Sequence, residues 1–254
     1  MFKKSYQRLK DYFSFLRDAS RLDLFELNFG LSSEDINYLY RASASVLPPP
    51  RGILSITLYC MKILWRVVIS SIKSRLLKRS NLVKESIPQG KILFFIVSLN
   101  QWSAVKEIFN RMQDCILLGW DTNSCSKPLT LRVCLCAIPF YFLVLKAYLS
   151  SKGYRKRSLT YYFDQYWLSY GFYVAGRCWI RKTKPAAVIL ANDHSGACRA
   201  MLEAARDEGI MSVYIQHAAI RKQRFPPLCF DYAFLCGRDD LEKYESFGPS
   251  RTKV

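Results

Sequence analysis

The chain has 254 residues, half of them hydrophobic, which is enough for a substantial core in one large domain or two small ones. Lys and Arg number 38 against 20 Asp and Glu, and the net charge of +18 favours an anionic partner such as a lipid surface, a nucleic acid or a phosphorylated substrate. The nine cysteines show no CxxC pair and no zinc-finger spacing. This argues against a metal site and favours reduced thiols in a cytosolic compartment.

The first 87 residues are predicted to form a basic helical portion. Ser5–Asp18 is amphipathic, and no apolar core or small-residue cleavage site follows it, so the N-terminus does not resemble a secretory signal. A second helix is expected to start at Ser32, where Ser32-x-x-Asp35 is a weak capping-box match. It should end before Pro48, because three successive prolines cannot continue a helix.

Two long apolar segments raise the question of a membrane. Ile53–Leu77 contains Lys62 and Arg66, and interior cations make a spanning helix costly. This helix is expected either to lie on an anionic membrane surface or to pack on the domain. Leu129–Leu149 has an apolar core that contains Pro139 and is shorter than the roughly 20 residues needed to span a bilayer. We therefore expect a buried or membrane-apposed helix there. Taken together, the two segments predict that the protein attaches peripherally to a membrane.

Residues 88–254 are predicted to form an α/β domain. Its first unit should consist of the strand Lys91–Ser98, the loop Leu99–Trp102, the helix Ser103–Met112 and the strand Cys115–Leu118. No GxGxxG follows the first strand, so the dinucleotide-binding fingerprint is missing. Asn100 and Gln101 either bind a polar ligand at the end of this strand or satisfy the backbone of the loop.

An aromatic-rich helix is expected over Ser158–Arg181. Aromatic residues interleaved with Lys and Arg suggest single-stranded nucleic-acid binding, but their helical spacing favours packing in the core. The elements that follow are the strand Ala187–Ala191, the helix Gly196–Glu208 with Gly209 as its C-terminal glycine, the strands Ser212–Gln216 and Tyr232–Cys236, and a last helix over Asp239–Phe247. Alternating strands and helices predict a Rossmann-like parallel sheet with a helical N-terminal portion.

The only two histidines of the chain, His194 and His217, each follow one of these strands. Ligands of open α/β sheets bind at the carboxyl ends of the strands, and neighbouring parallel strands lie about 4.8 Å apart. If the two strands pair, both imidazoles face one crevice. The alternative is that each histidine is a satisfied polar residue in a loop.

Several motifs of this region occur together, namely Asn192-Asp193-His194-Ser195, Val213-Tyr214-Ile215-Gln216-His217-Ala218, Pro226-Pro227, Asp231-Tyr232 and Cys236-Gly237. In this combination the chain resembles the end of the N-terminal Rossmann-like domain of GT-B-fold transferases that build bacterial surface and capsular polysaccharides. The polysialyltransferase-like and teichoic-acid glycerophosphotransferase-like groups are examples. The resemblance covers about Ile92 to Gly248, and its specific motifs lie after Pro185.

The resemblance implies a nucleotide-activated sugar as donor substrate, a glycan or lipid-linked acceptor, no cofactor and a location on the cytoplasmic face of the inner membrane. It implies that His217 is the base or contacts the donor, with Asp193 as the alternative base. Asn192 and His194 should position substrate, and Ser195 with the first amides of its helix should bind an anionic group. The remaining substrate-binding residues expected are Gln216, Asn100, Gln101, Arg221 and Gly237.

Two departures from the family pattern matter. The Gln-His-Gly of the family is Gln216-His217-Ala218 here, so a methyl group stands where positive φ or a close ligand is expected. A complete second Rossmann domain, which usually holds the donor, is not recognised in residues 88–254. A partner subunit that supplies this domain, a truncated and inactive remnant, or a membrane-associated scaffold are therefore the alternatives. A nucleic-acid partner is not expected, because no binding motif is recognised.

Overall fold

The computed structural model describes residues 2–32, 52–77, 92–119, 131–218, 220, 225–248 and 252–254. It confirms the α/β class: five strands form one all-parallel sheet in the order β2-β1-β3-β4-β5. The strands are β1 Ile92–Phe95, β2 Cys115–Leu118, β3 Ala187–Leu190, β4 Met211–Ile215 and β5 Tyr232–Phe234. The strand order reverses between β1 and β3, which makes this the topological switch point of the sheet.

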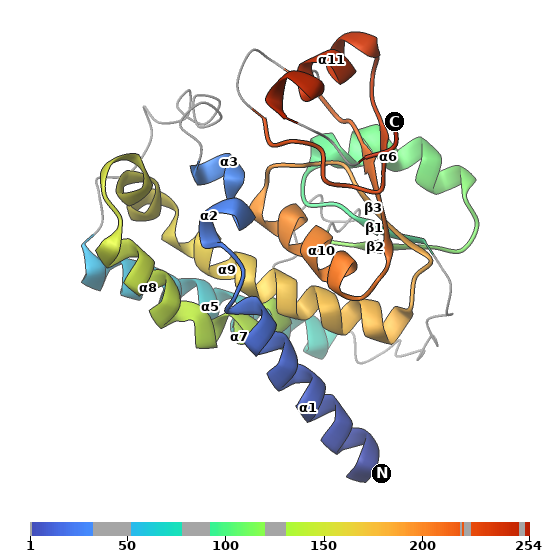
Figure 1. The fold of residues 1–254 in the computed structure, drawn as a ribbon. Coiled ribbons are helices and arrows are strands. Elements are labelled where there is room, and N and C mark those ends of the chain that lie inside the picture. Colours follow the sequence, from blue (N-terminus) through green and yellow to red (C-terminus); the bar gives the residue numbers. More distant parts are fainter. Residues whose placement is uncertain are drawn as a thin grey trace.

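Helices cover both faces of the sheet, as parallel strands require. On one face, Phe94 of β1 and Ile189 of β3 pack against α6, which spans Leu99–Arg111. On the other face, Phe95 and Leu190 join the larger core formed with α9 and α10. Helix α9 spans Gly153–Thr183 and α10 spans Gly196–Asp207, and Figure 1 shows α10 between α9 and the strands. Successive residues of a strand thus alternate between the two cores on opposite faces of the sheet.

The aromatic helix α9 is the axis of the larger core. Among its fully buried side chains are Tyr166, Trp167, Tyr170 and Tyr173, which confirms core packing as the reason for their helical spacing. The helix is kinked at Tyr162, which has non-helical backbone angles. Because the aromatic rings point into the protein, they form no stacking platform on the surface.

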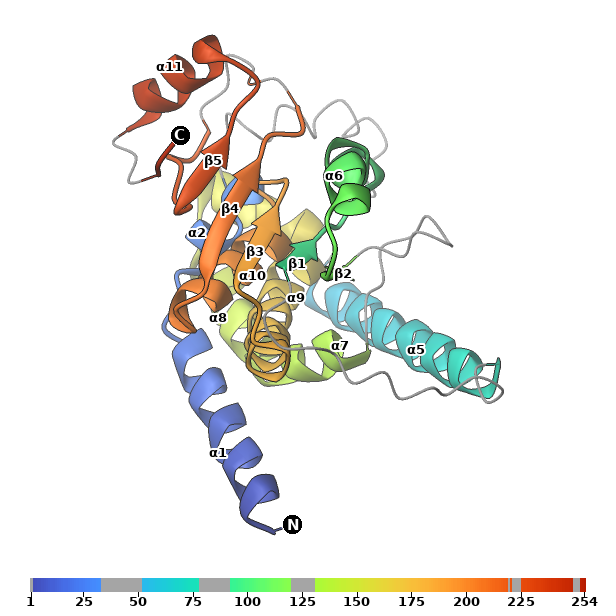
Figure 2. The same ribbon diagram turned by 90° about the vertical axis from the view of Figure 1, so that its right-hand side faces the viewer.

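The N-terminal helices pack on the same core. They are α1 Phe2–Ala19, α2 Leu24–Leu27 and α3 Phe29–Ser32, and Phe15, Leu24 and Leu31 are buried in contact with the α9–α10 layer. Figures 1 and 2 show the N-terminal half of α1 projecting beyond the rest of the molecule. The helix expected after Ser32 and the boundary expected at residue 87 lie outside the described residues.

A further helical layer lies on the side of α9 away from the sheet (Figures 1 and 2). It contains α5 Ile53–Leu77, as predicted, together with α7 Leu131–Ala137, the 3-10 turn Ile138–Phe140 and α8 Tyr141–Ser150. The prediction of a single helix over Leu129–Leu149 is wrong, because the segment is divided into two α-helices by a 3-10 turn. This turn contains Pro139, whose ring cannot continue a regular α-helix. By length and composition alone, Leu131–Ser150 is the one stretch of the described residues that could cross a membrane, and 39% of it is buried.

Candidate functional site

The two histidines lie at the carboxyl edge of adjacent strands. Strands β3 and β4 pair in parallel, with Leu190 opposite Tyr214, which confirms the pairing on which a shared crevice depends. His194 follows β3 and His217 follows β4, and the charge of His194 lowers the pKa of His217, so the two rings lie near one another. The residues after β3 also flank the switch point between β1 and β3, where open α/β sheets bind ligands.

The side chain of Asn192 shapes the turn that leaves β3. Its Oδ1 accepts hydrogen bonds from the backbone N–H groups of His194 at 3.0 Å and Ser195 at 2.6 Å. This Asx turn fixes the orientation of the Asn192 side-chain amide, because two N–H donors can bond only to its oxygen and not to its nitrogen. The amide nitrogen of Asn192 then points toward His194 Nε2 across a long contact of 3.4 Å.

Asp193 and His194 form a hydrogen-bonded pair. His194 Nδ1 donates to Asp193 Oδ1 at 2.9 Å, because an ionised carboxylate can only accept a hydrogen bond. Tyr244, from helix α11 (Arg238–Phe247), donates its hydroxyl proton to Asp193 Oδ2 at 2.6 Å. Burial raises the pKa of Asp193, but the hydrogen bond and charge of His194 and the Tyr244 bond outweigh it, and the pKa lies below its ordinary value. The carboxylate is ionised and orients the imidazole through its bond to Nδ1.

Tyr244 keeps its proton. Burial and the adjacent charge of Asp193 both raise the pKa of this phenol far above its ordinary value. Its hydroxyl also lies 3.3 Å from that of Tyr214 on β4. Tyr244 thus connects Asp193, which follows β3, to a side chain of β4. The ring of Phe225 contacts His194 edge-on, with the ring centres 5.8 Å apart. The His194 side chain nevertheless remains 13% exposed.

His217 has a different environment. Burial, followed by the charge of His194, lowers its pKa, so the ring is neutral at pH 7. Its Nδ1 is buried and has no hydrogen-bond partner within the described part of the chain. Among the described residues no carboxylate is hydrogen-bonded to this ring, in contrast to His194; the ring bonds the backbone of Ala191, and this bond and the charge of Asp193 both raise its pKa.

Gln216 and Gly237, both expected to bind substrate, belong to a network that joins the ends of β4 and β5 to α11. The Gln216 amide nitrogen donates to Asp240 Oδ2 at 2.6 Å and to the Ala218 carbonyl at 2.8 Å, and its oxygen accepts from the Cys236 N–H at 2.8 Å. Gly237 is the N-cap residue of α11. Gln216 is buried and its amide is fully used within the protein.

Asn100 and Gln101 lie in the first turn of α6 rather than in a loop. The loop predicted over Leu99–Trp102 is wrong, because Ser98 caps the helix by accepting a bond from the Gln101 N–H at 3.4 Å. Gln101 is buried and its Oε1 accepts from the Val97 N–H at 3.0 Å, as in the backbone-satisfying alternative. Asn100 is exposed. Arg221 lies outside the described residues.

Helix α10 begins directly behind the Asp193–His194 pair. Ser195 is its N-cap, and the hydroxyl oxygen accepts from the Cys198 N–H at 3.3 Å. Arg199, in the first turn, donates to the backbone carbonyl of Asp193 at 3.2 Å. The amide nitrogen of the buried Asn28 donates to Ser169 Oγ at 2.9 Å, and its Oδ1 lies against Gly196. The N-terminal segment thus supports the turn that carries the site.

Gly30 also supports this turn, through direct backbone contact. Its N–H donates to the His194 carbonyl at 3.0 Å, and a Cβ at this position would lie 2.6 Å from that carbonyl oxygen. We expect Gly30→Ala to lower the free energy of unfolding by about 1–3 kcal/mol, because the backbone of the turn must move. Urea denaturation measures this, with Gly52→Ala as the matched control, since no atom lies within 4 Å of a Cβ there. Equal stability of the two variants would contradict the close packing.

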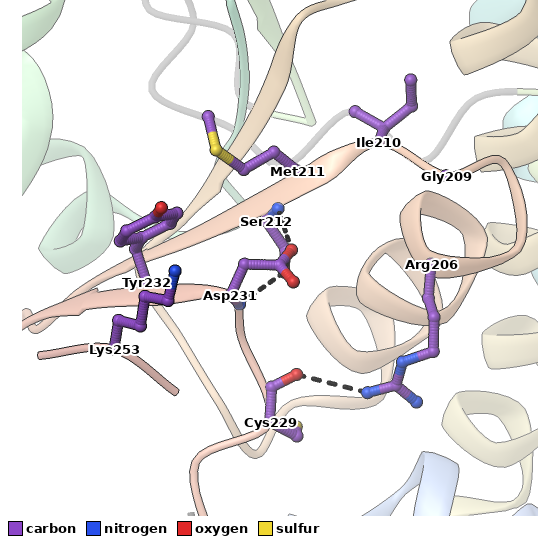
Figure 3. Close-up of a pocket in the computed structure, with 9 residues that line it drawn as sticks. All are labelled: Arg206, Gly209, Ile210, Met211, Ser212, Cys229, Asp231, Tyr232 and Lys253. Carbon is purple, nitrogen blue, oxygen red and sulfur yellow. Dashed lines mark hydrogen bonds between the residues drawn. The ribbon is translucent and has the colours of Figure 1, made fainter. Parts of the chain in front are cut away.

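A pocket of about 500 Å³ lies at the opposite, amino-terminal edge of the sheet (Figure 3). Asp231 is at its centre, and its Oδ2 accepts from the backbone N–H of Ser212 at 2.7 Å and from the Ser212 hydroxyl at 2.8 Å. Arg206 donates to the Cys229 carbonyl at 3.2 Å. These contacts tie the start of β5 to the start of β4. The pocket shares no residue with the Asp193–His194 site.

The sequence did not predict the residues that contact the site from other parts of the chain. The main ones are Tyr244, Tyr214, Asn28 and Arg199. Tyr244 lies within a helix that was expected, but nothing in the helical spacing indicates that its hydroxyl meets Asp193. Among the residues that the structure describes, no three His, Cys, Asp or Glu side chains gather as a metal site would require. Comparisons with models of known protein families, with curated proteins and with solved structures found no match.

Proposed function

We propose that this protein is a glycosyltransferase of the GT-B type. It transfers a sugar, or a related phosphate-linked unit, from a nucleotide-activated donor to a hydroxyl group of a surface-polysaccharide or lipid-linked acceptor. The observation that carries the proposal is the Asp193–His194 pair at the carboxyl end of β3, beside the switch point of the sheet. The likeness of Asn192–Ser195 and Gln216–Ala218 to motifs of such transferases supports the choice of reaction.

In this proposal His194 is the general base. Its Nε2 accepts the proton of the acceptor hydroxyl while the acceptor oxygen forms a bond to the anomeric carbon of the donor. The bond between that carbon and the donor phosphate breaks, and the nucleotide leaves with the electron pair. Asp193 stabilises the imidazolium that forms, as a buried carboxylate does when it is bonded to the far nitrogen of a catalytic histidine.

Other residues of the site take supporting roles, some of them predicted from the sequence and one, Tyr244, found in the structure. Asn192 and Tyr244 hold the pair in place through their bonds to the turn and to Asp193. Ser195 and the first amides of α10 provide a positive helix end for an anionic group of a substrate. His217 is better placed for substrate contact than for proton transfer, because within the described part of the chain its ring is hydrogen-bonded to the Ala191 backbone and to no carboxylate. The protein would act on the cytoplasmic face of a bacterial inner membrane, where nucleotide sugars are made.

The test is a transfer assay with the purified full chain. The protein is incubated with a panel of UDP-, CMP- and GDP-sugars and CDP-glycerol, together with short surface oligosaccharides as acceptors. We expect nucleotide release and a mass increase of one transferred unit in one of these combinations. If no nucleotide is released, and nuclear magnetic resonance detects neither nucleotide nor glycan binding, the proposal is wrong.

A non-catalytic scaffold, or a subunit that needs a partner for the donor domain, gives a different result in the same experiment. A partner-dependent enzyme still binds the acceptor oligosaccharide and shows resonance shifts at His194, because the acceptor side of the fold is present. A scaffold binds neither substrate. The two alternatives are therefore separated by acceptor binding in the absence of turnover.

A further inference from the structure

Helix α5 presents an apolar stripe to solvent. The stripe consists of Leu54, Leu58, Met61 and Trp65, whose spacing places them on one side of the helix, and each is at least 60% exposed. The helix is held to the protein by its other side, where Ile56 and Cys60 are buried. An exposed apolar stripe of this length requires an explanation, because it gains nothing from contact with water.

The helices α7 and α8 repeat this arrangement. Their inner side is buried in the core through Val133, Ala137 and Val144, among others. Their outer side exposes Leu135, Ile138, Phe142 and Leu149, of which Phe142 is 76% exposed. The hydroxyl groups of Thr57 on α5 and Tyr141 on α8 lie 2.6 Å apart, so the two helical segments are neighbours. Together they form the outer layer on the side of α9 away from the sheet (Figures 1 and 2).

The charges of this outer layer have one sign. Ile53–Leu77 and Leu131–Ser150 contain no Asp or Glu, whereas α11 holds four acidic residues within ten. Among the residues of this layer whose side chains the structure describes, the exposed cations are Lys62, Arg66, Arg132 and Lys146. None of them makes an ion pair with another described residue. The layer is therefore apolar and cationic at once, with no internal neutralisation.

We propose that the outer layer formed by α5, α7 and α8 docks on an anionic phospholipid bilayer. The helices lie in the plane of the interface, with the apolar side chains among the acyl chains and the cations against lipid phosphates. Charge complementarity favours this occupant over a protein partner of mixed charge. A spanning arrangement of Leu131–Ser150 would pull Val133 and Val144 out of the core, where both are fully buried. This inference does not depend on the transfer chemistry.

The test is flotation of the purified full chain with phosphatidylcholine vesicles, with and without phosphatidylglycerol. We expect binding to the vesicles that contain phosphatidylglycerol and a decrease in binding as salt is added, because salt screens the attraction. The double variant Leu58→Glu/Trp65→Glu should weaken binding about tenfold or more. The matched control, Ile108→Glu/Phe234→Glu, alters exposed apolar side chains on α6 and β5 and should bind like the unmodified protein.

A second measurement locates the contact. Brominated lipids should quench the fluorescence of Trp65 on binding, and Trp65→Phe should remove that part of the quenching. Circular dichroism confirms that both double variants are folded. Absence of binding to phosphatidylglycerol vesicles, equal binding to neutral vesicles, or equal loss in the control variant would overturn the proposal. Dimers that form without vesicle binding and dissociate in Leu58→Glu/Trp65→Glu would also overturn it, because the layer would then be a contact between copies.

Discussion

His194→Asn should lower the rate of sugar transfer by about 10²–10⁴-fold while the protein remains folded. The amide of asparagine can replace Nδ1 as the donor to Asp193, so the bond that His194 makes at 2.9 Å can be kept. The Nε2 lone pair, which takes the proton of the acceptor, has no counterpart in asparagine. The rate is measured in the nucleotide-release assay with the donor and acceptor that the unmodified protein uses.

The matched control is His217→Asn, at the other histidine of the same sheet edge. We expect this variant to change KM more than kcat, because in the proposed mechanism His217 contacts substrate without moving a proton. A large loss of kcat in His217→Asn together with full activity in His194→Asn would contradict the assignment. The base would then be His217, as the family resemblance alone implies.

Arg177→Met should lower the free energy of unfolding by about 3 kcal/mol, because it removes a buried charge that pairs with Asp18 and Glu208, although Glu208 keeps its ion pair with Arg181. The Arg177 side chain is only 7% exposed, and its guanidinium donates to Glu208 Oε1 at 2.6 Å and to Asp18 Oδ2 at 2.7 Å. It also lies over the ring of Phe15, 4.3 Å from the ring centre. Burial lowers the pKa of Arg177, but the bonds to Glu208 and Asp18 outweigh it and keep the guanidinium charged.

Arg177 ties α1 and the end of α10 to α9, so we expect the loss to appear as a lower melting temperature, by roughly 10 °C for a chain of this size. The control is Arg238→Met, which removes an Arg–Glu242 pair whose side chains are 88% and 62% exposed. Exposed pairs contribute about 0–1 kcal/mol, so this variant should melt close to the unmodified protein. Equal shifts in the two variants would show that burial of the Arg177 network has no special effect.

Much of the fold follows from local sequence. Continuous apolar runs predicted all five strands, because parallel strands are buried on both faces. Turn chemistry predicted both ends of α10: Ser195 caps its start, and Gly209 takes a positive φ of 65° just beyond its end. The alternation of strands and helices then implied a parallel sheet with the residues after β3 and β4 at one edge.

Local patterns were insufficient where a residue had two possible partners. Gln101 and Gln216 look like ligand-binding residues at strand ends, yet both amides satisfy backbone groups inside the protein. The first turn of α6 was taken for a loop, because polar residues at a strand end suit either structure. Whether such a side chain bonds to the backbone or faces a ligand depends on which groups the tertiary fold places next to it.

The sequence by itself determined the class of fold, the placement of both histidines at one sheet edge and the two apolar, acid-free segments, since these depend on the order and spacing of residues in the chain. Only the tertiary structure distinguished the histidines. The bond from Tyr244 to Asp193 joins residues 51 positions apart, and the contact of Gly30 with His194 spans a still longer stretch. Such contacts depend on how helices pack around the sheet, and no local periodicity records them.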